Sequence, residues 1–251
     1  MSFSSLNTAL ALALCAFVAV PELWGQTIET DRPDQTEAAT LVPVGGVQIE
    51  TGLAGYTAAN GSCTGYTLPT ALLRLGLHER FELRVVGQRD QVQPNLIDIP
   101  ATWLVESSWD VGAKVAGWNN ESSQMCLLAH YRFRPSGLSG GQVRVNLAKP
   151  LGDRFSVGTN LGMVWTWATE TVDAMKAFEY TVAVGYNVTE SLYAYVEGFG
   201  ESGQWQGDGG LAWRPDPLSQ FDVSVGWAGD YGQSYVAVGW SKLMLTGQSG
   251  M

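Results

Sequence analysis

The sequence has few of the residues from which catalytic and metal sites are commonly built. Its 251 residues include two histidines and three cysteines. Cys15 lies in an apolar run near the start, so only Cys63 and Cys126 remain, which permits one disulfide at most and gives no metal-ligand spacing. We therefore expect no metal and no other cofactor.

Charge is also scarce, because Asp, Glu, Lys and Arg make up 15% of the chain. The 24 acidic residues outnumber the 14 basic ones, which gives a formal net charge of −10. Binding to nucleic acid requires clusters of Lys and Arg that neutralise phosphates, and the sequence has none. Nucleic acid is therefore excluded as a partner.

Long apolar runs are absent except near the start of the sequence. The run Ala9–Val20 has the length of a signal-peptide core and is shorter than the roughly 20 residues that a membrane-spanning helix needs. We predict a signal peptide over residues 1–26. A lipoprotein signal ending at Cys15 is the alternative, but the large Leu14 disfavours it. A membrane location of the mature chain would then require strands.

Glycine and aromatic residues are abundant, with 30 Gly, 10 Trp, 9 Tyr and 8 Phe. Segments such as Arg80–Gln88 and Phe155–Trp167 alternate apolar residues with small or polar ones, which is the period of a half-buried β-strand. We expect about twelve strands, an even number as in single-chain bacterial barrels. They are Val44–Tyr56, Tyr66–Leu77, Arg80–Gln88, Trp109–Gly117, Met125–Phe133, Gln142–Lys149, Phe155–Trp167, Phe178–Tyr186, Leu192–Gly200, Gly209–Trp213, Phe221–Trp227 and Val236–Trp240.

The connections between these strands alternate between short and long. Short connections such as Leu151–Arg154 are expected to be periplasmic turns, and longer ones such as Gln91–Ser108 and Glu201–Asp208 to be extracellular loops. A soluble β-sandwich or lipocalin-like barrel also has alternating strands, but its second face is solvated rather than rich in glycine and charge that can pair. The sequence therefore predicts an all-β fold, a transmembrane antiparallel up-and-down barrel over residues 44–245, with a periplasmic lead-in at 27–43 and a tail at 246–251. The location that follows is the bacterial outer membrane.

The first residues after the predicted signal peptide carry a family resemblance. The string Ile28–Glu37 (IETDRPDQTE), followed by Val42–Gly52 (VPVGGVQIETG), resembles the opening of outer-membrane barrels assigned to transport or to the meta-pathway of phenol degradation. Residues 69–84 look like the second and third strands of that family. The resemblance implies passage of small molecules, with aromatic or otherwise apolar ones as candidates. It implies no particular solute.

Three functions remain open from the sequence. The first is a channel or carrier whose partners are outer-membrane lipid, a small solute and the barrel-assembly machinery. The second is a structural barrel with a plugged lumen, and the third is a soluble all-β ligand-binding protein. A lipid hydrolase would be a fourth, but we expect no enzyme, because His78 falls in a turn and His130 points inward, away from the lipid.

Two sets of residues are candidates for functional roles. Strand parity turns one set toward the lumen, where charges avoid the roughly 2 to 4 kcal/mol that basic residues cost on the lipid face. These side chains either hold the wall together or set selectivity, and they are Glu50, Arg74, Glu82, Arg84, Lys114, Arg132, Arg144, Glu179 and Asp222. The second set is the motif Glu29, Thr30, Asp31, Arg32, Pro33 and Asp34, which forms either a turn or a charged segment that lies in the periplasm or plugs the lumen and contacts the substrate or the barrel wall.

Overall fold

The computed structural model describes residues 27–32, 35–59, 61–92, 104–135, 137–169, 173–228 and 233–245. Twelve β-strands form one closed antiparallel barrel, as the sequence predicts. The strands are β1 (Gly46–Thr57), β2 (Cys63–His78), β3 (Phe81–Val92), β4 (Leu104–Asn120), β5 (Ser123–Phe133), β6 (Gly140–Leu151), β7 (Phe155–Thr166), β8 (Met175–Asn187), β9 (Leu192–Glu201), β10 (Gln204–Asp216), β11 (Ser219–Ala228) and β12 (Gln233–Leu245). The signal peptide and the tail, predicted at residues 1–26 and 246–251, lie outside the described residues.

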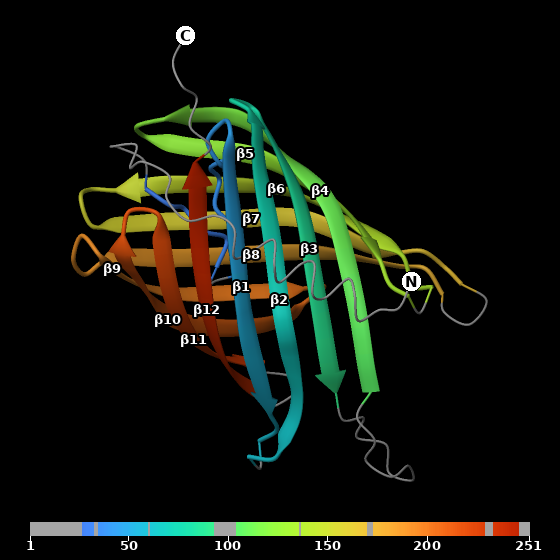
Figure 1. The fold of residues 1–251 in the computed structure, drawn as a ribbon. Helices are drawn as coiled ribbons and strands as arrows, with labels where there is room; N and C mark the ends of the chain where they lie inside the picture. The colour runs from blue at the N-terminus through green and yellow to red at the C-terminus, as the bar shows by residue number, and fades with distance from the viewer. Residues whose placement is uncertain are drawn as a thin grey trace, which may run out of the picture.

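Each strand pairs with its neighbours in sequence, and β1 pairs with β12 to close the wall. The seam runs over the whole length of β1, from Gly46 opposite Leu245 to Thr57 opposite Ser234. Figure 1 shows the strands tilted around a common axis, with β1 and β12 side by side. Closure leaves no unpaired strand edge, which a wall exposed to lipid requires. Within the described part of the chain, no helix is long and apolar enough to cross a membrane.

The barrel is apolar outside and polar inside. Large apolar side chains such as Val182, Val196 and Val225 are exposed on the outer surface, whereas the buried side chains are mostly polar or charged. Soluble proteins rarely expose so much contiguous apolar surface, and their cores are apolar. This distribution fits a barrel surrounded by lipid and argues against a soluble all-β fold.

Aromatic side chains form two bands at the ends of the strands. At the end with the short turns, Trp213 stacks against Phe221 with ring centroids 5.9 Å apart. At the opposite end, Trp205 meets Trp227 edge to face at 5.4 Å. Such bands occur where a barrel crosses the two lipid headgroup regions.

Two predictions about the hairpin of β9 and β10 need correction. The segment Glu201–Asp208 is not a long loop, because β9 runs to Glu201 and β10 begins at Gln204. Ser202 and Gly203 form the connection, both with positive φ, as a two-residue hairpin turn requires. The predicted strand Gly209–Trp213 was too short because the glycines and charges at its two ends mask the alternation.

The described residues of the N-terminal segment, 27–32 and 35–43, enter the barrel. They lie in the lumen toward the end with the short turns, and they contact the inner faces of strands from β1 to β11. Ile28 and Val42, near the two ends of the segment, pack with Leu243 and Leu245 of β12 in a small apolar cluster. The segment is therefore fixed to the wall at its start and at its end.

Candidate functional site

The lumen is divided by hydrogen bonds between the N-terminal segment and opposite walls. On one side, the backbone N–H of Val42 donates to Glu82 of β3 at 2.7 Å. Across the lumen, the backbone N–H of Gln35 donates to Glu197 of β9 at 2.7 Å. Between these walls, Asn160 of β7 both accepts from the N–H and donates to the C=O of Glu37. The segment is not a strand and forms no ladder of backbone hydrogen bonds. These bonds to side chains of the wall hold it along its length instead.

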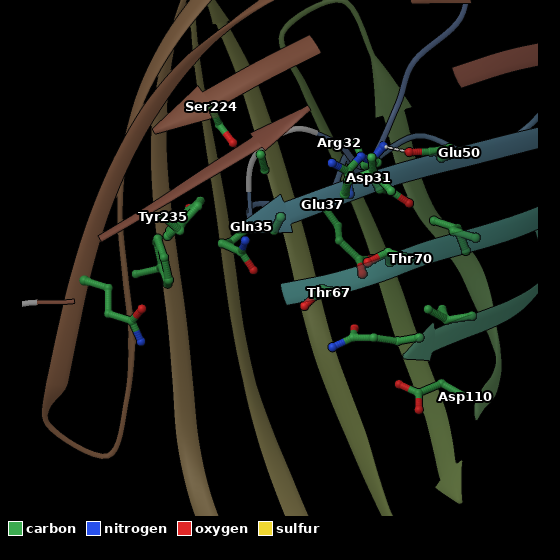
Figure 2. Close-up of a pocket in the computed structure, with 18 of the residues that line it drawn as sticks. Asp31, Arg32, Gln35, Glu37, Glu50, Thr67, Thr70, Asp110, Ser224 and Tyr235 are labelled. Atoms are coloured by element: carbon green, nitrogen blue, oxygen red, sulfur yellow. Dashed lines mark hydrogen bonds between the residues drawn. The ribbon is translucent and has the colours of Figure 1, made fainter. Parts of the chain in front are cut away.

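Three cations from adjacent strands surround Asp31 at the centre of this arrangement. Its carboxylate lies 2.6 Å from Arg84 Nη1, 2.8 Å from Lys114 Nζ and 3.3 Å from Arg74 Nη1. Glu50 accepts from the backbone N–H of Asp31 at 2.9 Å, the bond drawn as a dashed line in Figure 2. Because β2, β3 and β4 are neighbours, one carboxylate can pair with a cation from each.

The charges compensate one another well enough for the Asp31 and Glu37 carboxyls to stay ionised. Burial alone would raise the pKa of Asp31, but Arg74, Lys114 and Arg84 outweigh it and hold that pKa well below its usual range. Burial likewise opposes ionisation of Glu37, yet its pKa is lowered, chiefly by Arg84. Buried ions of this kind are stable only when paired and hydrogen-bonded.

Arg32 projects toward the seam between β1 and β12 and occupies a slot there. Gly52 of β1 and Gly239 of β12 are direct partners across that seam. A Cβ at Gly52 would stand 2.3 Å from Arg32 Nη2, and one at Gly239 would stand 2.6 Å from Arg32 Nε. Asp222 of β11 lies beside the slot, 3.7 Å from the guanidinium. The two glycines leave room for the guanidinium, which a Cβ at either position would force to shift.

Two of the cavities lie on opposite sides of the N-terminal segment. The outer chamber, about 500 Å³, faces the loop end and is lined mainly by polar side chains, among them Glu37, Asp110 and Arg132. Figure 2 shows Asp31, Arg32 and Glu37 gathered at one end of it, with Tyr235 on a different wall. The inner chamber, about 700 Å³, faces the short turns and is lined by Glu29, Thr30 and the turn residues 119–121. Arg32 and Glu37 line both chambers.

The structure places the lumen candidates of the sequence in three groups. Arg74, Glu82 and Lys114 lie buried with Asp31 in the ion network, where Arg84 and Glu50 join them. Arg132 and Arg144 line the outer chamber, Arg144 being paired with Glu179 at 2.9 Å. Asp222 meets Arg32 at the seam. Of the N-terminal motif, Glu29 and Thr30 bind the wall through the Glu29 carbonyl and the Thr30 hydroxyl, while Pro33 and Asp34 lie outside the described residues.

Sequence reasoning missed several residues that hold the segment. Thr36 bonds to Thr181 at 2.7 Å and to Glu197, and Asp208 accepts from the Tyr235 hydroxyl on the same side of the lumen. The alternation of side chains along β9 and β10 would have predicted that Glu197 and Asp208 face the lumen. Their partners could not have been found, because nothing in the sequence indicates which strand faces a coil segment.

The remaining candidates for chemistry are separated in space. His78 is the exposed last residue of β2, and His130 of β5 faces the outer chamber. Cys63 and Cys126, the cysteines within the described residues, are both free, and Cys126 is buried against the Ala38 carbonyl. Within the described residues the two histidines therefore lie in different parts of the barrel, His78 beside a turn and His130 in the lumen.

Comparison with known proteins gives a consistent result. The family model described as "Putative MetA-pathway of phenol degradation" matches residues 30–241, which extends the resemblance seen at residues 28–90 over the barrel. An outer membrane channel from Pseudomonas putida F1 superposes with a TM-score of 0.61 at 11% identity, covering 85% of this chain and 99% of that chain. The KdgM porin gives 0.58 at 13% identity, covering 77% and 98%. At these identities the similarity shows the barrel fold. Comparison of the sequence with curated proteins gave no match.

Proposed function

This chain belongs to the family of the MetA-pathway of phenol degradation, and we propose that it works as an outer-membrane channel or transporter for small molecules. The observation that carries the proposal is a polar lumen with a chamber at each end, enclosed by a closed wall that is apolar outside. Barrels of 16 to 18 strands hold open aqueous channels and barrels of eight are filled, so twelve strands leave limited room. Only small solutes would pass.

The outer membrane is the environment that the wall fits. Leu161, Met163 and Val184 belong to a broad apolar belt between the two aromatic bands, and acyl chains would cover it. Lipid and the barrel-assembly machinery are then the partners of the wall, and a small solute is the partner of the lumen. The family description and the two chambers support aromatic molecules that also carry a polar group as solutes. We assign no covalent chemistry to the chain.

A structural barrel closed by its own N-terminal segment is the second candidate. It is favoured by one observation, the buried ion network in which Asp31 binds Arg84 and Lys114. Separating one charge from such a network costs about 3 to 5 kcal/mol. The segment would then leave the lumen rarely unless something displaces it.

Conductance of the purified full-length protein in planar bilayers tests the proposal. A channel gives discrete current steps, and a barrel closed by the segment gives none. Unboiled and boiled samples are compared on a denaturing gel first, because a closed barrel migrates faster until it is heated. A heat-modifiable barrel without steps would support the structural candidate and overturn the channel.

A further inference from the structure

We propose that the outer chamber binds a small monocarboxylate between Arg132 and Arg144, next to His130. This inference rests on the proposed function, because it names the class of solute that the channel accepts. The site lies on the inner faces of β5 and β6, beside the buried network around Asp31, to which Glu37 connects it through Arg84 and Arg144.

The register of β5 and β6 places the three side chains in a diagonal row. His130 is directly opposite Gln142, Arg132 is opposite Gly140, and Arg144 is opposite Leu128. Residues two apart on a strand share a face, so His130 stands between the two arginines. Gly140 opposite Arg132 adds no side chain and leaves room at the chamber wall.

Both guanidinium groups keep donors that their acidic partners do not use. Arg132 donates to Asp110 through Nε and Nη2, at 2.8 Å and 2.7 Å for the shortest contacts. Arg144 donates to Glu179 through the same two atoms, at 2.9 Å each. Its Nη1 has only a 3.9 Å approach to Glu37. A guanidinium has five N–H donors, so the Nη1 end of each arginine can serve a second carboxylate.

His130 supplies an independent indication of a ligand. Its imidazole lies over Gly112 of β4, where a Cβ would stand 1.9 Å from the ring Cδ2. The residue is 7% exposed, and its Nε2 atom has no hydrogen-bond partner among the described residues. A buried ring nitrogen without a partner is costly, and a hydrogen-bonding occupant that reached it from the chamber would remove that cost. An N–H at Nε2 would donate to a carboxylate oxygen.

The accessible charge of this wall is positive although its formal charges balance. The side chains of Arg132 and Arg144 are 37% and 16% exposed. Their acidic partners Asp110 and Glu179 are 8% and 10% exposed. An entering solute therefore meets guanidinium groups first. The nearby carboxylates would repel a second negative charge, so a monocarboxylate fits better than a phosphate dianion.

The size and the remaining lining suggest a single aromatic ring as the body of the solute. The chamber of about 500 Å³ exceeds the volume of one such ring, and Phe199, Leu53 and Tyr235 supply apolar surface to it. Benzoate is therefore a suitable probe. Benzamide has the same shape without the charge.

Equilibrium dialysis of radiolabelled benzoate against the detergent-solubilised full-length protein tests the site directly. We expect benzoate to bind and to be displaced by unlabelled benzoate, but not by benzamide or inorganic phosphate at the same concentration. Arg132→Gln and Arg144→Gln should each weaken binding by about 10-fold or more, the value of one hydrogen bond to a charged group. Arg154→Gln is the matched control, because Arg154 lies in an exposed turn and contacts Tyr186. Folding of each variant is checked by heat-modifiability.

The outcomes separate this inference from the proposed function. Benzoate binding by a protein that conducts no current would overturn the channel and leave the site standing. Current steps without benzoate binding would overturn the site and leave the channel. Equal displacement by benzamide, or equal weakening by Arg154→Gln, would also overturn it, since the guanidinium pair would then not be the binding group.

Discussion

Replacing Asp31 with Asn tests how the N-terminal segment is held. Asp31 is buried, and its carboxylate lies 2.6 Å from Arg84 Nη1. Lys114 Nζ donates to its two oxygens at 2.8 Å and 2.9 Å. Removing one partner of a buried ion pair costs about 3 to 5 kcal/mol, because the cations are left uncompensated. Glu37 also approaches Arg84 and Lys114, so we expect the lower end, about 3 kcal/mol. The wall keeps its ladder bonds, and the cost therefore falls on docking of the segment.

Cysteine labelling measures that docking. Thr36 is buried against Thr181, so a Thr36→Cys protein is labelled by a maleimide only when the segment leaves the wall. The background carries Cys63→Ser and Cys126→Ala. A loss of about 3 kcal/mol predicts labelling roughly 100-fold faster with Asp31→Asn. Asp153→Asn, in an exposed turn, is the matched control. Equal labelling rates in the two variants would refute the role given to Asp31.

Three further predictions follow from the wall and the segment. Gly239→Ala should expel the Arg32 guanidinium from its slot and accelerate the same labelling, whereas unchanged labelling would mean that the slot does not hold the segment. Val182 faces outward and is 48% exposed, so Val182→Arg should lower the stability of the barrel in lipid by roughly 2 to 4 kcal/mol. The temperature at which gel mobility shifts should then fall, and an unchanged temperature would contradict contact of this residue with lipid. Because the pKa values of Asp31 and Glu37 are lowered, their contribution to docking is full above the ordinary carboxyl pKa and is lost only as pH falls further. Maleimide reacts with the thiolate, so the labelling rate is divided by that of a free thiol at the same pH; this ratio should be the same at pH 5 and pH 7 and should rise below about 4.

The barrel could be predicted from the sequence because each strand is a local signal. In Phe155–Trp167 apolar residues alternate with small or polar ones except at Thr159 and Val164, and the outer surface of a membrane barrel imposes that pattern directly. Strand ends were less certain where polar residues continue a strand beyond the lipid, as in Gln204–Asp208. Parity depends on side-chain alternation and not on the exact bounds. Alternation therefore predicted correctly that Arg84 and Lys114 face the lumen.

The position of the N-terminal segment could not be predicted in the same way. Its charges favoured either a turn or a charged segment in the periplasm or the lumen, and the choice depends on contacts up to 190 residues away, such as Thr30 with Gln220. The slot for Arg32 is formed by Gly52 and Gly239, which are adjacent only because the barrel closes. A sequence with 30 glycines gives no sign that these two differ from the rest. Closure of the fold creates the site, so local patterns could not locate it.

The conductance of a Thr36→Cys/Thr181→Cys protein, measured before and after reduction, tests whether the N-terminal segment controls passage through the lumen. The two hydroxyl oxygens are 2.7 Å apart, so a disulfide at these positions would fix the segment in the lumen. Our account predicts that the oxidised protein shows small current steps or none, and that reductant restores the steps of the wild-type protein. Large steps in the oxidised protein would show that the segment does not control the lumen. The absence of steps from both the reduced and the wild-type protein would contradict a channel.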